Sequence, residues 1–124
     1  MNNINNQVFS EDQLQLEVMD GEDIEVLWLG KSVQRNPSQF IIPTLSDVMK
    51  RGVDQDKTVV WDFRQLEYMN SSTITPVIKT LEMVKKGLGK VKLIYNKTKK
   101  WQDLSFSALR IFETKDGRIQ VIGL

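Results

Sequence analysis

The sequence contains neither cysteine nor histidine. Disulfides and thiol catalysis are therefore excluded, and a zinc site or a Ser/His hydrolytic triad lacks its usual side chains. A strong charge of either sign is also missing, because 17 Lys and Arg residues stand against 16 Asp and Glu residues, for a net charge of +1. This balance supplies no general attraction to nucleic acid. We expect no metal, no cofactor, no nucleic-acid partner and no enzymatic activity.

Long apolar runs are absent as well, and no segment approaches the length that crosses a bilayer. The chain begins with MNNINNQVFSEDQLQ, which lacks the basic and apolar regions of a signal peptide. These features predict a cytoplasmic protein without direct membrane insertion. The first residues are mostly polar and cannot repay the entropy of ordering. We therefore expect a mobile polar tail over residues 1–12, followed by a single domain over residues 13–124.

Apolar residues in the first half of the chain change from a strand period to a helical period. An alternation of two over residues 14–18 and again over residues 24–28 predicts an opening hairpin. Helical spacing follows over residues 41–52, where the glycine at the end is expected to close the segment. This helix begins either at Pro43 or near Pro37, and the sequence leaves both starts open.

The second half alternates strands and helices. The pattern predicts a buried strand over residues 58–63, an amphipathic helix over 74–86, a strand over 91–95, a third helix broken near residues 105–107, and a last strand. Trp28, Trp61 and Trp101 lie on apolar stripes and are expected in the core. Helical crossovers favour parallel pairing, so we expect an α/β fold: a mixed, mainly parallel sheet of about five strands with helices mostly on one face.

The stretch VVWDFRQLEYMNSSTI, residues 59–74, resembles the middle of a STAS domain, the fold of bacterial anti-sigma factor antagonists and of the cytoplasmic ends of sulphate transporters. In that family a hydrophobic strand with an Asp is followed by Met, Asp, Ser, Ser or Thr, and Gly-Leu, which opens an amphipathic helix. The residues that match are Val59 to Phe63, Met69, Ser71, Ser72 and Ile74. The resemblance extends over roughly residues 14–112 and implies a single STAS-like domain.

This resemblance also implies a site. In the antagonist branch the Ser directly after the motif's Asp is phosphorylated, and that position is Ser71 here, with Ser72 and Thr73 as the alternatives. The implied partner-binding surface consists of Met69, Asn70, Ser71, Ser72, Thr73, Ile74 and Asp62. The implied partners are a GHKL-type serine kinase that is also the anti-sigma factor, and a PP2C-type phosphatase. The expected function is that of an anti-sigma factor antagonist switched by serine phosphorylation.

Two residues depart from the family pattern. Asn70 stands where the family has Asp, and Thr73 stands where it has Gly. Asn keeps an oxygen that can cap a helix but loses the negative charge, and Thr adds a branched side chain. Since Asn, Ser and Thr are all preferred helix caps, capping alone also explains the cluster. The alternative function is therefore a STAS-like adaptor or structural subunit of a transporter or signalling assembly that is not phosphorylated.

Overall fold

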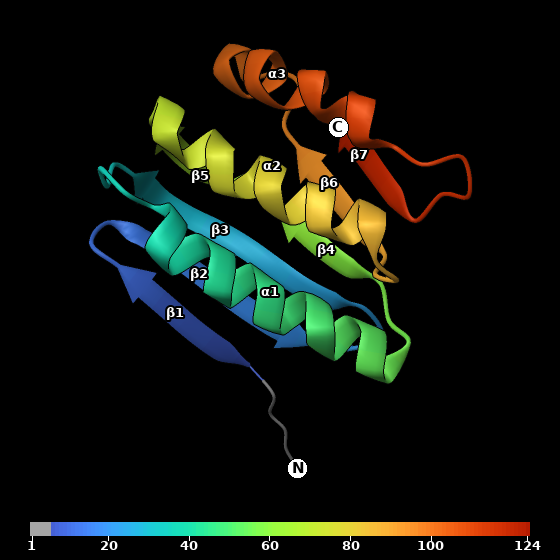
Figure 1. The fold of residues 1–124 in the computed structure, drawn as a ribbon. Coiled ribbons are helices and arrows are strands. Elements are labelled where there is room, and N and C mark those ends of the chain that lie inside the picture. The colour runs from blue at the N-terminus through green and yellow to red at the C-terminus, as the bar shows by residue number, and fades with distance from the viewer. Residues whose placement is uncertain (1–5) are drawn as a thin grey trace.

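The computed structural model describes residues 6–124, and its secondary structure forms one sheet with helices packed against it (Figure 1). The strands are β1 (Gln7–Glu11), β2 (Leu14–Asp20), β3 (Ile24–Ser32), β4 (Val59–Asp62), β5 (Leu66–Met69), β6 (Val91–Tyr95) and β7 (Ile119–Gly123). The helices are α1 (Ser38–Gln55), α2 (Ser71–Lys86) and α3 (Lys100–Phe106), which continues into the 3₁₀ helix η1 (Ser107–Phe112).

The sheet runs in the order β1-β2-β3-β4-β6-β7, and β5 pairs with the last residues of β3. The first three strands are antiparallel to one another, whereas β3, β4, β6 and β7 are parallel. Each parallel crossover passes through a helix, as a strand that returns in the same direction requires. The predicted fold class, an α/β fold with a mixed and mainly parallel sheet and helices mostly on one face, is confirmed, but the sheet has seven strands where about five were predicted, because β1 and β5 were not expected.

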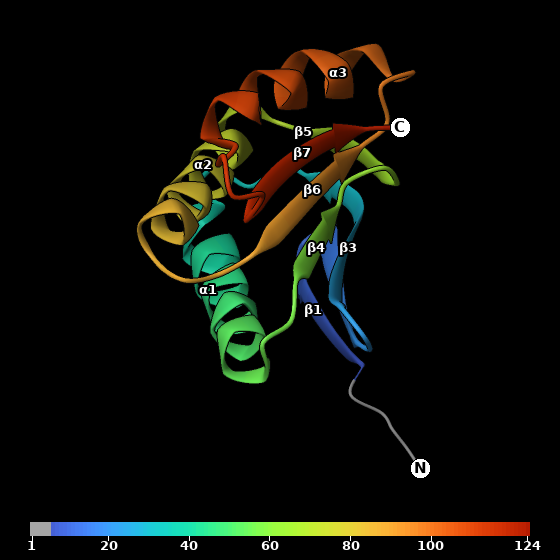
Figure 2. The same ribbon diagram turned by 90° about the vertical axis from the view of Figure 1, so that its right-hand side faces the viewer.

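The helices lie on one side of the sheet, as two views at right angles show (Figures 1 and 2). Alternate strand residues point toward them and form the core, including Trp28 and Trp61, which are fully buried as predicted. Phe63 lies between Trp28 and Phe106, with 4.4 Å between ring centroids on either side. This aromatic stack joins β3 and the end of β4 to α3. Trp101 is half-buried and packs against the same core.

The prediction of a polar tail over residues 1–12 is wrong for residues 7–11, which form strand β1, while residues 1–5 lie outside the described part of the chain. β1 pairs antiparallel with β2, and Phe9 packs against the core. Arg51 of α1 donates to the side chain of Gln7 at 2.7 Å. An edge strand pairs its backbone with one neighbour only and needs few apolar residues. The polar composition of residues 1–12 therefore did not indicate this strand. The domain therefore begins before residue 13.

Helix α1 starts directly after Pro37, so the earlier of the two predicted starts is the one observed, and Pro43 is inside the helix. Gly52 does not close it, contrary to the prediction. The helix ends at Asp56, which adopts a left-handed conformation with φ of 53°. Gly52 instead permits a close approach, because a Cβ there would lie 2.7 Å from the Val59 side chain of β4.

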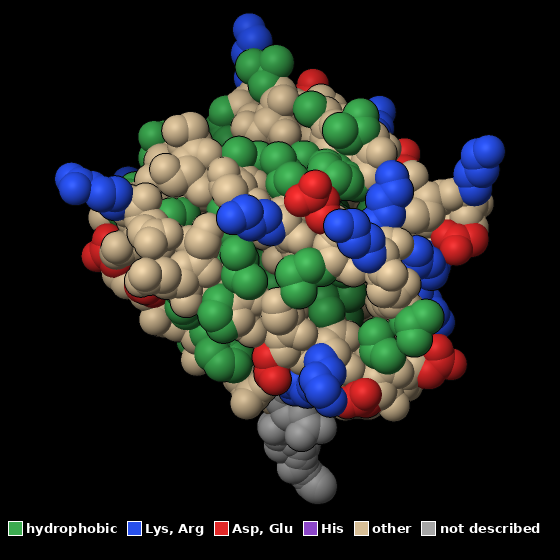
Figure 3. Space-filling model, viewed as in Figure 1, with side chains coloured by type: hydrophobic (Ala, Val, Ile, Leu, Met, Phe, Trp, Pro, Cys, Tyr) green, Lys and Arg blue, Asp and Glu red, His purple; other side chains and the backbone are tan. Residues whose placement is uncertain are grey.

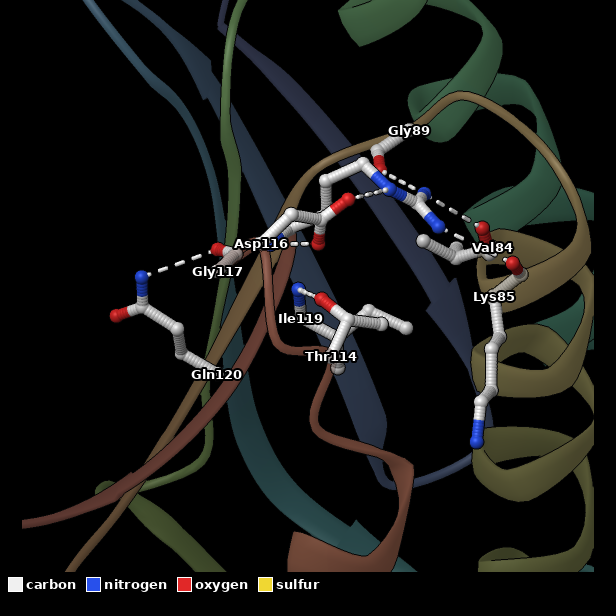
Figure 4. A network of polar contacts seen from close by, with 9 residues as sticks. Val84, Lys85, Gly89, Thr114, Asp116, Gly117, Ile119 and Gln120 are labelled. Atoms are coloured by element: carbon white, nitrogen blue, oxygen red, sulfur yellow. Dashed lines mark hydrogen bonds and ion pairs between the residues drawn. The ribbon is translucent and has the colours of Figure 1, made fainter.

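The C-terminal end of α2 is held by a side chain from the other end of the sequence. Arg118, in the turn before β7, donates from one guanidinium nitrogen to the carbonyls of Val84 and Gly89, both at 3.0 Å, and from the other to Lys85 at 3.1 Å (Figure 4). Its Nε donates to Asp116 at 3.1 Å. The guanidinium thus adds charged donors to two carbonyls in the last turn of α2, where Val84 also accepts from the backbone N–H of Gly87, and to the carbonyl of Gly89 in the loop that follows. This contact fixes the direction of α2 against the sheet.

Candidate functional site

The loop between β5 and α2 ends in Asn70, which is the N-cap residue of α2. Asn70 has an extended backbone, and its side-chain oxygen accepts hydrogen bonds from the backbone N–H of Thr73 at 3.2 Å and from the Thr73 hydroxyl at 2.8 Å. Capping of this kind satisfies an amide of the first turn and stabilises a helix by about 1 kcal/mol. The capping role that the sequence suggests for this cluster therefore belongs to Asn70.

Asn70 also forms hydrogen bonds with the end of β3 and the loop that follows it. Its backbone N–H donates to the carbonyl of Ser32 at 2.9 Å, and its side-chain nitrogen donates to the carbonyl of Gln34 at 2.8 Å. A carboxylate could replace the capping oxygen but has no N–H to give to Gln34. This gives a structural reason for the amide at the position where the STAS pattern has Asp. Asn70 thus uses both its side-chain oxygen, as the cap, and its side-chain nitrogen, as the donor to Gln34.

Thr73 is fully buried, and its hydroxyl lies between Asn70 and Ser32. The Ser32 hydroxyl is 2.6 Å from that of Thr73, across 41 residues of sequence. Because Thr73 donates its own proton to Asn70, Ser32 is the donor in this pair. The hydroxyl of Thr73 is therefore engaged on both sides and closed off from solvent. Of the three predicted candidates for phosphorylation, it is the one a kinase cannot reach in this conformation.

Ser71 and Ser72, the first two residues of α2, are exposed. The first turn contains no acidic residue, so the partial positive charge of the helix N-terminus is not compensated there. Pro76, the sixth residue of the helix, has no N–H to donate to the carbonyl of Ser72. The start of α2 thus presents two hydroxyl groups on a backbone that the buried network of Asn70 and Thr73 holds in place.

Apolar side chains border the exposed serines. Tyr68 is 49% exposed, and Met69 and Ile74, both predicted as partner-binding residues, are half-buried against the core. Over the whole helix-covered side, hydrophobic groups are separated by Lys, Arg, Asp and Glu (Figure 3). Transient protein interfaces are about as apolar as the rest of a protein surface, so this mixed composition is compatible with one but does not mark it.

Asp62, the remaining predicted site residue, belongs to a different surface. It is at the end of β4, on the face of the sheet opposite the helices, between Leu27 and Ile94 in the strand register. Its carboxylate accepts two hydrogen bonds from the guanidinium of Arg64, at 3.0 and 2.8 Å, and one from the Arg64 backbone N–H at 3.0 Å. Burial raises the pKa of Asp62, but these hydrogen bonds outweigh it and hold the pKa below its usual value.

Sequence reasoning missed Ser32, Gln34 and Tyr68. Ser32 and Gln34 belong to the strand end and loop before α1 and meet Asn70 only through the parallel pairing of β3 with β5. Nothing in their local sequence indicates this contact. Tyr68 could have been predicted from the sequence, unlike Ser32 and Gln34, because aromatic residues are enriched at interfaces and Tyr68 directly precedes the predicted site.

The described residues, 6–124, contain no group of three or more Asp or Glu side chains placed to hold a metal ion. Over the same residues, none of the helices combines the length and apolar character needed to span a bilayer. The site therefore consists of hydroxyls, backbone groups and apolar side chains.

No protein-family model matches the sequence, and no curated protein matches it. Among solved structures, a similar one is that of the anti-sigma factor antagonist SpoIIAA in its unphosphorylated form, at 22% sequence identity and a TM-score of 0.47. The match covers 65% of this chain and 71% of the other. A likeness at this level concerns the fold, so function is argued from the residues of the site.

Proposed function

We propose that this protein is a phosphorylation-controlled regulator of the anti-sigma factor antagonist type. The unmodified surface around Asn70, Ser71 and Ser72 binds a kinase that is also an anti-sigma factor, and phosphorylation of Ser71 releases that partner. The observation that carries the proposal is the exposure of the Ser71 hydroxyl as the first residue of α2, on a loop anchored by buried hydrogen bonds. The protein is a substrate and a binding partner in this scheme, without enzymatic activity of its own.

The helix start can accept a phosphate without loss of the fold. A phosphoserine carries about 1.5 to 2 negative charges, and the amides and dipole of a helix N-terminus stabilise a negative group. The first turn of α2 has no acidic residue to repel it. A partner packed over the loop would instead have to bury a hydrated dianion, at a cost of several kcal/mol. About 5.5 kcal/mol is enough to turn a 99:1 complex into a 1:99 one.

Ser71 is preferred over its neighbours for separate reasons. Thr73 is enclosed and hydrogen-bonded on both sides. Ser72 is as exposed as Ser71, so accessibility alone does not separate them. Ser71 is the residue that matches the modified position of the motif that the sequence resembles. Ser72 serves as the matched control.

The first test is intact mass with site mapping on protein isolated from its native cells under changing growth conditions. We expect a phosphate on Ser71 that varies with conditions and is lost in Ser71→Ala but kept in Ser72→Ala. A second test measures binding to the purified GHKL-type kinase, where Ser71→Asp should bind at least about tenfold more weakly than wild type. Equal binding of wild type and Ser71→Asp would make the phosphorylation switch untenable. A phosphate found only on Ser72 would overturn the assignment of Ser71 and make Ser72 the modified residue.

A second function is favoured by Asn70, which replaces the charged residue of the motif and serves a structural purpose through Gln34. In that case the protein is an adaptor or structural subunit that uses the same surface without modification. Unmodified Ser71 under every condition, together with neighbouring transporter genes in place of kinase and phosphatase genes, would support the adaptor. The PP2C-type phosphatase belongs only to the switched scheme.

A further inference from the structure

The face of the sheet opposite the helices is uncovered over the described residues (Figure 2). Alternate positions of the strands point to this side, because their neighbours form the helix-covered core. Its centre is apolar and only partly accessible, and consists of Leu27 and Leu29 on β3, Val60 on β4, Ile94 on β6 and Ile122 on β7. Aliphatic side chains on one side of a sheet are a common basis for sheet-on-sheet packing.

On the two strands next to β4, the residues of this face are arranged symmetrically, whereas on the outer strands Glu17 of β2 corresponds to Ile122 of β7. In one row of the register, Val60 lies between Glu25 on β3 and Lys92 on β6. In the next row, Asp62 lies between Leu27 and Ile94. Opposite charges thus flank the central strand in one row, and aliphatic side chains of similar size flank it in the other.

A two-fold axis parallel to β4 would make this face complementary to itself. Such an axis places β3 of one copy opposite β6 of the other, so Glu25 meets Lys92 of the second copy, and Leu27 meets Ile94. Each contact occurs twice, as symmetric pairing requires. We propose that the open face of the sheet is a self-complementary interface through which two copies of this chain pair back to back, with the helix-covered sides facing outward.

The charged pair at the centre of the face is compatible with this packing. Asp62 lies near the axis, and its carboxylate is already paired with Arg64. Glu17, on the outer strand β2, accepts a hydrogen bond from the Gln15 side chain and would lie at the rim of the interface. Two sheets stacked in this way stand about 10 Å apart, with their strands roughly aligned. The start of α2 is on the other side of the sheet, so a dimer leaves Ser71 free on both copies. The inference does not depend on phosphorylation.

The test is the molar mass of the full chain in solution, by light scattering after size exclusion and by sedimentation equilibrium from low to high micromolar concentration. We expect a dimer. Lys92→Glu places two like charges against Glu25 of the other copy and should raise the dissociation constant by about a hundredfold. Glu25→Lys should weaken pairing to a similar extent, and the double variant with both reversals should restore it.

Lys79→Glu is the matched control, because Lys79 is an exposed residue of α2 on the helix-covered side, and this variant should remain a dimer. Circular dichroism checks that each variant is folded. Wild-type protein that is monomeric at every concentration would overturn the proposal. A dimer that persists unchanged in Lys92→Glu, or that the double reversal fails to restore, would place the interface elsewhere and overturn it as well. Ser71→Asp should leave the mass unchanged, so failure of this proposal and of the phosphorylation switch are separate results.

Discussion

The two ends of α2 are capped in opposite ways. At the N-terminal end the cap is Asn70, the residue next to the helix, and the exposed hydroxyls of Ser71 and Ser72 remain free. At the C-terminal end the backbone N–H of Gly87 donates to Val84, and Arg118, 34 residues beyond Val84, adds a hydrogen bond from each of its guanidinium nitrogens. Each end combines a local cap with contacts from distant residues, but only the N-terminal end leaves hydroxyl groups exposed, and only the C-terminal end is held by a charged side chain. We infer that changes at the C-terminal end affect stability, and that changes at Ser71 affect binding.

The largest effect is expected from Arg118→Ala. This change leaves three carbonyls without a charged donor and should lower the free energy of unfolding by about 3 kcal/mol, since hydrogen bonds to charged groups are among the stronger ones. Urea denaturation measures it. Arg118→Lys, which keeps one charged donor group, should lose about half as much. A loss below about 0.5 kcal/mol in Arg118→Ala would show that the capping contact is not needed.

A smaller effect is expected at the N-terminal end. Asn70→Ala removes the cap and the contact with Gln34, and should lower the free energy of unfolding by about 2 kcal/mol. Asn70→Asp keeps the cap but sets a carboxylate against the Gln34 carbonyl, and should lose about 1 kcal/mol. Urea denaturation at neutral and acidic pH compares the two. The loss of unfolding free energy in Asn70→Asp should be smaller at acidic pH, because a protonated carboxyl group can donate to the Gln34 carbonyl. A loss that is larger at acidic pH would contradict this explanation.

A third effect is the dependence of stability on pH, which should be present for the Asp62–Arg64 ion pair and absent for the carbonyl groups bound by Arg118. Asp62 is bound to Arg64, which holds the pKa of this carboxyl below its usual value, whereas the carbonyls bound by Arg118 do not titrate. Stability from the Asp62 pair is therefore fully present above the unfolded pKa of about 4 and is lost as pH falls through the lower folded pKa.

Because the Arg64 side chain is 45% exposed, this pair should contribute only about 0.5 to 1 kcal/mol. Unfolding free energies of wild type and Arg64→Ala, measured between neutral pH and about pH 2, should converge as the pH falls. A difference that stays constant over this range would mean that the pair contributes through packing alone.

The smallest effect on stability is expected at Ser71. Ser71→Ala should change the free energy of unfolding by less than about 0.5 kcal/mol, because the side chain is exposed. Ser71→Asp should stabilise the protein by about 0.5 kcal/mol through the helix dipole. Thermal unfolding measures both. A clear loss of stability in Ser71→Asp would mean that modification acts by unfolding the helix start, and not by excluding a partner.

Local patterns predicted most of the fold. The alternation before residue 29 gives β2 and β3, and the apolar stripe from Ile74 onward gives α2 within three residues of its observed start. The polar cluster at Asn70 predicted a cap, which the structure contains. These features depend on neighbours within one or two turns of chain, so they can be seen without knowledge of the fold.

Features that depend on distant partners were missed. β1 and β5 are short strands whose order depends on pairing with β2 and β3. Gly52 was interpreted as a helix end, but it is a point of contact between α1 and β4. Asp62 was grouped with the loop at Asn70, although strand alternation places it on the opposite face of the sheet. For β5 the deciding neighbour is far away in the sequence, and for β1 and Gly52 it belongs to another element, whereas the alternation that places Asp62 is local.

The sequence by itself determined the strand and helix order, the absence of thiol and histidine chemistry, and the position of two serines at the start of a helix. Only the tertiary structure decided that Thr73 is closed off while Ser71 and Ser72 are open. It also decided why residue 70 is an amide, and which face of the sheet stays uncovered. The reason is physical: periodicity encodes which side of an element is buried, whereas a hydrogen bond across 36 or 41 residues exists only after the sheet has brought both groups together.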